Sequence, residues 1–365
     1  MQRDASPHVT KVATTDISEM LDPFPAGRRM PMKGFDEEFV DIADYIIRIT
    51  DRIWHERKIE LCRDYYSEDG VIHTMAGDIS GSAIVEANTR ATLEAFPDRT
   101  LDGDNVIWSG DEEKGYYSSH LITSRMTNLG PSEFGPATGK RARIRTIADC
   151  LCHENKIGEE WLMRDNAALV SQLGFDVSKV AAEQAATDKV EGRNLIATLS
   201  EWREATVDGA AAIAGSPRPD HAETAPDDFA KYVIDVVWNR GDLDALPALF
   251  DFRVGAHLTN GRDLYGTLEY REYCEAVHSA LGELSASVDH VACIPYLGDA
   301  VDIAVRWSIA ATHSGDGIFG PASGAPVFIL ASSHWRLING RIREEWTVFD
   351  ELALLRQIET HRLAD

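Results

Sequence analysis

The sequence predicts an α+β protein built from two tandem copies of one cone-shaped α+β barrel, in which a curved antiparallel sheet wraps around N-terminal helices. Two observations support this. Motifs of the first half return in the second half at a nearly constant spacing. Within each copy, helical patterns come first and a long run of strand patterns follows, which is typical of α+β domains. A strongly curved sheet would leave a conical pocket against the helices.

The repeat shares one register. Residues 134–139, FGPATG, return 185 positions later as residues 319–324, FGPASG, and the Glu-Glu-Trp at 159–161 returns at 344–346. Trp54 and His73 return 184 positions later as Trp238 and His257. A single-residue insertion explains the change of spacing, because chance matches would not share a register.

The repeat divides the chain into four parts. We expect one domain over residues 35–176 and a second over residues 225–365, each of a size that suits one core. Residues 177–224 between them are predicted to be a helical segment, rich in Ala, Glu and Lys, followed by a linker with Gly, Ser and Pro. Residues 1–34 have no clear period and are interpreted as an N-terminal arm or a disordered tail.

The elements of the first copy follow from apolar spacing and turn residues. Apolar positions at helical spacing predict two helices over residues 35–66, broken near residues 55–57, and a third over residues 81–96 that stops at Pro97. A short strand is predicted over residues 70–74. Longer strands are predicted over residues 105–109, 116–128, 141–152 and 157–165.

Composition restricts the partners. The net charge of −24 repels phosphate backbones and anionic lipid, which argues against nucleic-acid and membrane partners. No stretch approaches the roughly 18 apolar residues of a membrane helix, and the first ten residues lack the apolar region of a secretory signal. The five cysteines include no CxxC pair, so a reducing cytoplasm is the expected location.

With its helix-helix-strand-helix-strands order, GPxxG-type loop and last strand reading GxIxEEWxxxD, the chain resembles the SnoaL-like polyketide cyclases of the nuclear-transport-factor-2-like superfamily. In the second copy, residues 311–315, ATHSG, resemble the family's GTHxG, and residues 339–346, NGRIREEW, match its last strand. The resemblance covers both copies. It implies the fold strongly and the substrate weakly, because the superfamily holds cyclases, isomerases, dehydratases, lyases and non-enzymatic modules.

Asp165 and Asp350 are the first catalytic candidates. In the resembled cyclases the aspartate four residues after the Trp is the acid–base of the pocket, and a carboxylate in an apolar pocket has a raised pKa that suits proton transfer near neutral pH. The alternative is that each aspartate ends a strand and caps the helical stretch that follows it, at residues 166–172 or 351–357.

Histidines supply the next candidates. His73 and His257 end the first strand of each copy, and either proton transfer, substrate orientation or inherited packing would explain them.

His120 occupies the position of Val305 in the second copy, on a face that is more polar in the first copy. If that face points inward, its polar groups need partners or a ligand. We therefore expect the first copy to hold the better equipped pocket, unless this face points to solvent or to a partner sheet.

The next strand adds Arg145 and Asp149, which either pair across the surface or bring an oxyanion donor and a second carboxylate to the pocket. His313 and His334 with Asp350 form a competing site in the second copy, where the first copy has Asn128 and Asp149 instead. Four aromatic residues are candidates to line an apolar pocket, with ordinary core packing as the alternative. These are Trp108, Tyr116, Tyr117 and Trp161.

No phosphate-binding, dinucleotide-binding or zinc-binding motif is present, and the scattered histidines lack metal-ligand spacing, so we expect no cofactor and no metal. The leading hypothesis is a cofactor-independent acid–base enzyme acting on a small aromatic or polycyclic substrate. Asp165, or its rival Asp350, would move the proton, with help from His73 and His120 and with Arg145 stabilising charge; Asp149, His257, His313 and His334 would contact the substrate.

The resemblance implies aldol-type making or breaking of carbon–carbon bonds, as in a cyclase or in the superfamily's lyases that remove formaldehyde from diaryl diols, or else isomerisation or dehydration. The alternative is a non-catalytic module that binds a ligand or dimerises. Because members of the superfamily often dimerise through their sheets, the resemblance also implies a homo-oligomer.

Overall fold

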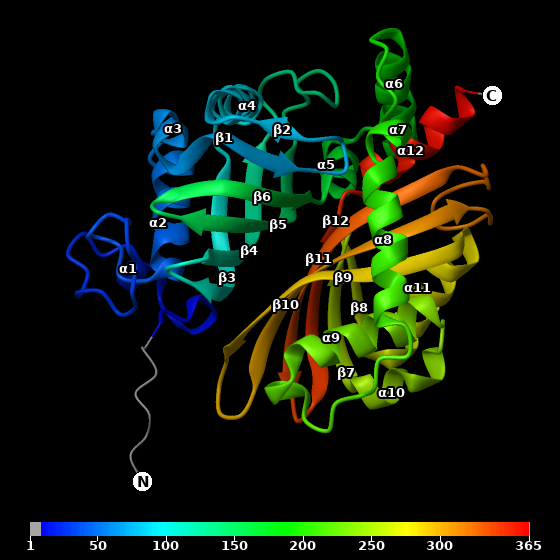
Figure 1. Ribbon diagram of the computed structural model, residues 1–365. Helices are drawn as coiled ribbons and strands as arrows, with labels where there is room; N and C mark the ends of the chain where they lie inside the picture. Colours follow the sequence, from blue (N-terminus) through cyan, green and yellow to red (C-terminus); the bar gives the residue numbers. More distant parts are fainter. Residues whose placement is uncertain (1–8, 365) are drawn as a thin grey trace. The chain divides into compact units, whose positions relative to one another are not determined.

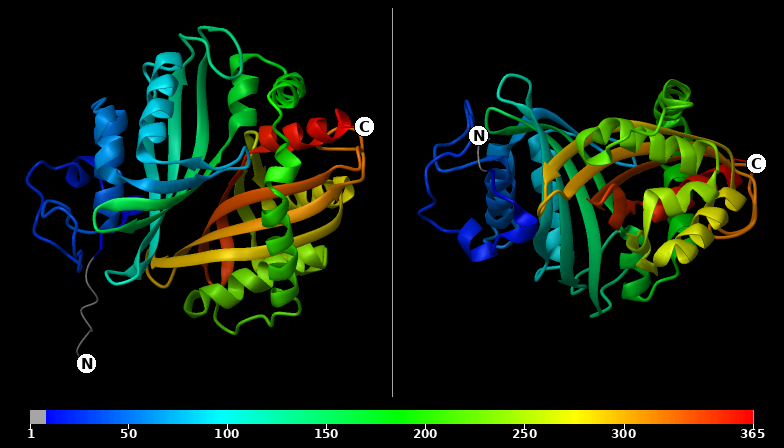
Figure 2. Two further views of the ribbon diagram at one scale, coloured as in Figure 1. Left: turned by 45° about the horizontal axis from the view of Figure 1, so that its top comes forward. Right: turned by 90° about the horizontal axis from the view of Figure 1, so that it is seen from below.

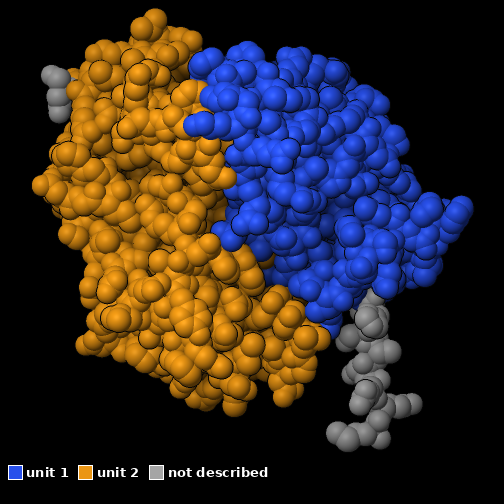
Figure 3. Space-filling model, turned by 180° about the vertical axis from the view of Figure 1, so that it is seen from behind, with its two compact units in different colours: residues 1–73, 78–162 blue, residues 74–77, 163–365 orange. Residues whose placement is uncertain are grey.

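The computed structural model describes residues 9–364 and divides into two compact units (Figures 1 and 3). The first unit comprises Met1–His73 and Asp78–Leu162, and the second comprises Thr74–Gly77 and Met163–Asp365. Each unit contains one six-stranded sheet with its helices, apart from the end of one strand that continues into the second unit.

The first sheet has the strand order β2-β1-β6-β5-β4-β3. Its strands are β1 (Tyr66–His73), β2 (Ile79–Ser80), β3 (Thr100–Asp111), β4 (Gly115–Thr127), β5 (Arg141–His153) and β6 (Lys156–Arg164). The helices of this unit are η1 (Val12–Thr14), α1 (Ile17–Met20), α2 (Ile42–Trp54), η2 (Ile59–Leu61), α3 (Cys62–Tyr65) and α4 (Ser82–Ala95). Helix α2 packs on strands β3 and β4.

The second sheet repeats this topology in the order β8-β7-β12-β11-β10-β9. Its strands are β7 (Phe250–Leu258), β8 (Arg262–Tyr265), β9 (Leu281–Pro295), β10 (Val301–His313), β11 (Pro326–Ile338) and β12 (Arg341–Phe349). The accompanying helices are α9 (Pro226–Ile234), the π-helix η4 (Asp235–Asn239), η5 (Leu243–Ala245), α10 (Leu246–Leu249), α11 (Gly266–Ala280) and α12 (Glu351–Arg362).

The segment between the repeats is largely helical, with α5 (Asn166–Leu173), α6 (Val177–Val190), α7 (Leu195–Thr198), α8 (Ser200–Ile213) and η3 (Ala222–Thr224). Helix α8 lies across strands β9 and β10, as the left view of Figure 2 shows. Thr206 on α8 donates to Ser308 Oγ on β10 at 3.0 Å, and Ser287 Oγ on β9 lies 2.9 Å from the same atom.

The predicted α+β class is confirmed, but each sheet is mixed rather than purely antiparallel. In both repeats the first strand pairs in parallel with the last one, β1 with β6 and β7 with β12. The two strands of each pair are separated by a helix and four further strands, so the connection is long enough to bring them together in the same direction.

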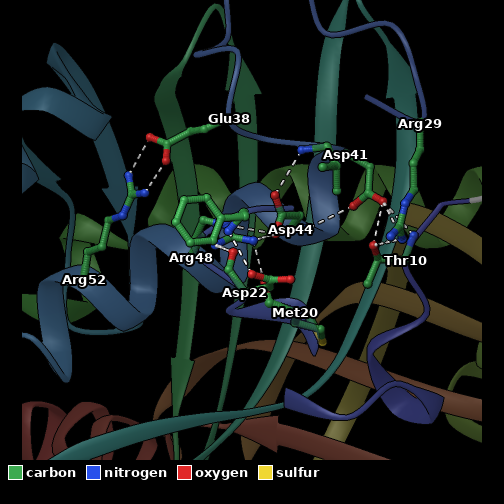
Figure 4. Close-up of polar contacts among 11 residues, drawn as sticks. Thr10, Met20, Asp22, Arg29, Glu38, Asp41, Asp44, Arg48 and Arg52 are labelled. Atoms are coloured by element: carbon green, nitrogen blue, oxygen red, sulfur yellow. Dashed lines mark hydrogen bonds and ion pairs between the residues drawn. The ribbon is translucent and has the colours of Figure 1, made fainter. Parts of the chain in front are cut away.

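Residues 9–34 form an arm that packs against the first unit (Figure 4). Val12, Met20, Met30 and Met32 are buried in its core cluster. The buried guanidinium of Arg48 on α2 donates to the Met20 and Asp22 carbonyl oxygens at 2.7 and 2.9 Å and to Asp44 Oδ1 at 3.0 Å. These contacts join residues 9–34 to the core of the first unit; residues 1–8 lie outside the described residues.

Strand alternation fixes which side chains enter each cone. Ile72 and Tyr116 belong to the core cluster of the first unit, so their face of the sheet is the inner one. Glu160 pairs with Ile72 across the β1–β6 ladder, and Glu345 pairs with Ala256 across the β7–β12 ladder. The second Glu of each Glu-Glu-Trp motif therefore points inward, and the Trp that follows it points outward.

Candidate functional site

The second repeat encloses a small aromatic cavity of about 20 Å³ inside its cone. Apolar and aromatic side chains dominate its walls, with one carboxyl and one hydroxyl group among them. The lining residues are Trp238, Leu258, Tyr270, Tyr273, Val277, Trp307, Ile309, Phe319, Ile329, Glu345, Thr347 and Phe349. A space of this volume holds about one water molecule.

Glu345 is the ionisable group of this cavity. It is 3 % exposed, and burial raises the pKa of its carboxyl to about 7, although hydrogen bonding from Thr347, Tyr270 and Trp335 opposes the rise. The Tyr270 hydroxyl and the Trp335 indole N–H lie close enough to the carboxyl to affect its pKa, but neither reaches the geometry of a full hydrogen bond at Oε2. The cavity thus pairs a carboxyl that titrates near neutral pH with an open acceptor position.

A chain of hydrogen bonds supports the other carboxyl oxygen. Trp307 Nε1 donates to Ser333 Oγ at 2.9 Å, Ser333 Oγ lies 2.7 Å from Thr347 Oγ1, and Thr347 donates to Glu345 Oε1 at 2.6 Å. An indole N–H can only donate, so Ser333 Oγ accepts a hydrogen bond from Trp307. The Ser333 hydroxyl then donates its own hydrogen bond to Thr347 Oγ1. The chain of donors therefore ends at Oε1, and Oε2 is the carboxyl oxygen that has no full hydrogen bond among the described residues.

The first repeat also has an inward-facing carboxyl, that of Glu160, but it lacks the chain of hydrogen bonds that supports Glu345. The hydroxyl of Tyr66 donates to Glu160 Oε2 at 2.9 Å, and Glu160 is 4 % exposed. Three apolar residues take the positions of Thr347, Ser333 and Trp307. They are Leu162, Ala148 and Ile122.

His120 points into the cone of the first repeat, where it is 2 % exposed. A Cβ atom on Gly103 would lie only 2.7 Å from His120 Nε2, so the imidazole packs against the backbone of β3. Burial lowers the pKa of His120 to about 3, so the ring is neutral near pH 7. Its Nε2, Ser118 Oγ and Thr146 Oγ1 have no hydrogen-bond partner among the described residues.

Asp165 and Asp350 occupy helix N-caps, as the capping alternative described. Asp165 accepts from the Ala168 N–H of α5 at 3.2 Å and from the backbone N–H groups of Asn260 and Gly261 at 2.8 and 3.3 Å. Asp350 accepts from the Ala353 N–H of α12 at 3.1 Å and from the Asn166 side chain at 2.6 Å. Neither aspartate lines the cavity of the second repeat. Burial raises the pKa of Asp165 to about 6, and the catalytic role of either residue stays a prediction.

His73 and His257 lie on the outer faces of their sheets. His73 contacts Asp78 and Glu159 through its two ring nitrogens, each at 3.0 Å, and its ring lies 5.3 Å from that of Trp161. His257 Nδ1 lies 2.6 Å from Asp263 Oδ1, and its ring stacks on Trp346 at 5.7 Å. The His–Asp separation is five residues in one repeat and six in the other, so the single-residue insertion lies in this turn.

The predicted aromatic set divides between the two faces of the first sheet. Trp108 and Tyr116 contact each other on the inner face at 6.0 Å. Tyr117 and Trp161 stack at 5.9 Å on the outer face. The structure therefore does not bring these four side chains together in one pocket.

Arg145 and Asp149 of β5 alternate with inward-facing Ala148 and Cys150, which places them on the outer face. His334 of β11 likewise lies on the outer face of the second sheet, opposite to Ser333 and Trp335. Their proposed contacts with substrate stay predictions, but the substrate would have to bind outside the cones to meet them.

His313 holds the GPxxG-type loop. It is fully buried, its Nδ1 lies 3.0 Å from Ser323 Oγ, and its carbonyl accepts from the Gly324 N–H at 2.9 Å. Asn128 has the same place in the first repeat, where its side-chain oxygen accepts from the Thr138 N–H at 2.8 Å. His313 and Asn128 thus share a loop-holding function.

Sequence reasoning followed the face of the Trp to Asp165 and Asp350, whereas the carboxyl that lines the cavity is that of Glu345. The available signal was the alternation within Glu-Glu-Trp, since neighbouring residues of a strand point to opposite faces. Over residues 9–364, no group of three His, Cys, Asp or Glu side chains is arranged to hold a metal ion, and no helix is long and apolar enough to span a membrane.

Comparison with known proteins identifies the family to which the chain is similar. The SnoaL-like polyketide cyclase model matches residues 45–173 and 230–358. No curated protein matches the chain. Solved structures match over about the length of one repeat. IdmH of Streptomyces antibioticus, described as a candidate polyketide cyclase, has 24 % identity, with 36 % of this chain and 97 % of that chain covered and a TM-score of 0.31.

Two further structures are similar to the chain over a comparable length. A candidate SnoaL-like polyketide cyclase from Jannaschia sp. CCS1 has 19 % identity, covering 40 % of this chain and 98 % of that chain, with a TM-score of 0.33. AclR of Streptomyces galilaeus, described as a candidate hydroxylase, has 18 % identity, covering 36 % and 94 %, with a TM-score of 0.32. On the match of the family model to both repeats, the chain belongs to the SnoaL-like polyketide cyclase family as a protein with two tandem domains.

Proposed function

We propose that the second repeat is a cofactor-independent acid–base enzyme site, in which Glu345 transfers a proton to and from an aromatic or polycyclic substrate. The observation that carries this proposal is the buried Glu345 carboxyl, which faces an aromatic cavity with Oε2 open and a pKa raised to about 7. A general base or acid works best when its pKa lies near the working pH.

The two oxygens of the Glu345 carboxyl have different hydrogen bonds and therefore different roles in the proposed reaction. The donors ending at Thr347 stabilise charge on Oε1, and Oε2 takes the proton. In aldol-type cleavage, Oε2 takes the proton of a substrate hydroxyl, and the carbon–carbon bond breaks with its electron pair moving toward the neighbouring carbonyl oxygen. The proton then returns from Oε2 to carbon, which balances the reaction without a cofactor.

The developing oxyanion needs donors of its own. The Tyr270 hydroxyl and the Trp335 indole N–H are the donors beside the carboxyl, and they could serve a substrate oxygen that took the place of their contact with Glu345. Ring walls such as Trp238 and Trp307 favour a flat, apolar substrate. Isomerisation or dehydration would use the same proton transfer at Oε2.

Exchange of carbon-bound hydrogen tests the proposal without a known substrate. β-Tetralone, a bicyclic ketone with acidic hydrogens beside its carbonyl, is incubated with the protein in heavy water and followed by proton NMR. We expect exchange to be accelerated by the wild-type protein and slowed about a hundredfold by Glu345→Gln, the size of effect typical for a general base. Glu160→Gln, the matching change in the first repeat, is the control and should exchange at the wild-type rate. An unchanged rate in Glu345→Gln would refute the proposal.

The small cavity favours one alternative, a non-catalytic module. A volume of about 20 Å³ admits no ring, so a protein that never opens would bind partners on its outside only. In that case β-tetralone would neither bind nor exchange in any variant.

A further inference from the structure

We propose that Trp238 is the movable wall through which a ring-bearing ligand reaches the Glu345 cavity, and that it sets the size of ligand that this site accepts. The inference rests on the proposed function for the identity of the site. Its own basis is the packing around Trp238, which separates the closed cavity from a much larger depression at the surface.

The depression has a volume of about 580 Å³. Its lining comes from the segment after η4 and from one side of α11, namely Gly241, Asp242, Leu243, Asp244, Arg271, Glu275, His278 and Ser279. The opposite side of α11 lines the cavity with Tyr270, Tyr273 and Val277. The depression and the cavity therefore lie on the two sides of the layer formed by α11 and the Trp238 segment.

Two aromatic contacts close this layer. The Trp238 ring stacks on Trp307 in the cavity, with ring centres 5.6 Å apart, and it also contacts His278, which lines the depression, at 5.7 Å. Hydrogen bonds hold the backbone around the indole: His278 Nε2 lies 2.8 Å from the Val237 carbonyl oxygen, and Arg271 of α11 donates to the Leu243 carbonyl oxygen at 2.8 Å. The Asn239 side chain donates to the Ala286 carbonyl oxygen at 3.0 Å and accepts from the Ala286 N–H at 2.6 Å. Moving the indole would join the depression to the cavity beside Thr347 and Glu345.

The backbone that carries Trp238 departs from the regular α-helix found at the equivalent place in the first repeat. Trp238 lies in the π-helical turn η4, a rare conformation that often marks functional positions, and Gly241 follows with a φ of 60°. The first repeat has no such turn, because α2 continues as an ordinary α-helix to Trp54, the equivalent residue. Trp54 lies under the guanidinium of Arg99 at 5.0 Å, whereas Leu93 takes the place of His278.

The other end of the cavity is fixed. Phe319 closes it from the loop after β10, whose Ser314 and Gly315 N–H groups both donate to the Ala280 carbonyl oxygen at 3.1 Å. A Cβ atom on Gly315 would lie 1.8 Å from the Ser279 carbonyl oxygen, so the loop docks tightly on the end of α11. His313 holds the same loop from within.

Binding of β-tetralone to the full chain tests the wall directly. Affinity is measured by calorimetry, and the association rate by quenching of tryptophan fluorescence. We expect the wild-type association rate to level off at high β-tetralone, because opening precedes binding. Trp238→Ala should tighten binding about tenfold, since the space is already open, while Trp54→Ala, its matched control, should leave the affinity unchanged.

His278→Ala keeps the indole and removes its outer support, so it should raise the plateau of the association rate about tenfold. This variant decides the question if Trp238→Ala does not fold. The proposal is overturned if Trp238→Ala binds no more tightly than wild type, if Trp54→Ala has the same effect, or if His278→Ala leaves the rate unchanged. Glu345→Gln separates the two proposals: if this variant exchanges β-tetralone at the wild-type rate, the proposed chemistry is refuted, while the binding results for Trp238→Ala and His278→Ala still decide whether Trp238 is the movable wall.

Discussion

At the scale of single residues, the inward position of Glu345 should lower the free energy of unfolding at neutral pH. A carboxyl group whose pKa is raised from 4.5 to about 7 on folding binds its proton more tightly in the native state. Its contribution to stability is therefore complete below about pH 4.5 and is lost as the pH rises through about 7.

We predict that Glu345→Gln loses this pH dependence. Between about pH 4.5 and pH 7, the free energy of unfolding of the wild type should fall by about 3 kcal/mol relative to that of the variant. Urea unfolding of both proteins at several pH values measures the difference, in which titrations common to both cancel. A constant difference across this range would show that the carboxyl titrates in the normal range.

Asp165 gives a second prediction at this scale. Its carboxylate accepts from three backbone N–H groups, so Asp165→Ala should lower the free energy of unfolding by about 2 kcal/mol, whereas Asp165→Asn, which keeps an acceptor and can cap, should lose less. Urea unfolding ranks the two variants. Loss of β-tetralone exchange in Asp165→Asn without loss of stability would instead assign Asp165 the catalytic role that the sequence suggested.

Candidate residues illustrate what a sequence conveys and what it does not. The recurrence of Glu-Glu-Trp and of the following Asp was visible, and both recur in equivalent places in the structure. Whether an Asp at a strand end caps a helix or faces a pocket depends on where the strand stops, and this is set by packing. The partners of Asp165, Asn260 and Gly261, lie about a hundred residues away, beyond the reach of local patterns.

At the scale of elements, the helical and strand segments were predictable because apolar spacing and turn residues act locally. The parallel pairing of the first strand with the last was not, since it depends on how a long connection closes. The π-helical turn at Trp238 was also invisible, because the sequence around it repeats the apolar pattern of an ordinary helix.

The N-terminal arm provides a prediction for an element. Arg48 is buried beside Asp44 and bonds two carbonyl groups of the arm, so Arg48→Met should lower the free energy of unfolding by about 3 kcal/mol by leaving a buried carboxylate unpaired. Limited proteolysis should then cut within residues 9–34. Arg29→Ala is the control, because Arg29 is 40 % exposed at its side chain and its ion pair with Asp41 should contribute little. Equal effects of the two changes would contradict this view of the arm.

At the scale of the whole molecule, the two repeats share a frame and differ in chemistry. Both place a glutamate inside the cone and a Trp outside. The first repeat surrounds its carboxyl with Tyr66 and apolar residues, while the second connects its carboxyl to Trp307 through two hydroxyl groups. The sequence favoured the first repeat because its β4 strand is more polar, but the enclosed cavity that faces a titratable carboxyl lies in the second.

This difference predicts that the second repeat, and not the first, catalyses the exchange of β-tetralone. Thr347→Val should slow β-tetralone exchange about tenfold by breaking the donor chain to Oε1, because a charge-assisted hydrogen bond contributes more than a neutral one. Proton NMR in heavy water measures it. Leu162→Val, at the equivalent position of the first repeat, serves as the control, and a similar slowing in that variant would assign activity to the first repeat.

The titration of Glu345 itself tests the central claim most directly. Protein labelled with carbon-13 at the glutamate carboxyl is titrated by NMR, and the Glu345 resonance is assigned by its absence from Glu345→Gln. The account predicts one carboxyl that titrates near pH 7 and disappears in the variant. If every glutamate of the folded wild type titrates near the ordinary value of 4.5, Glu345 is not the acid–base group of this protein.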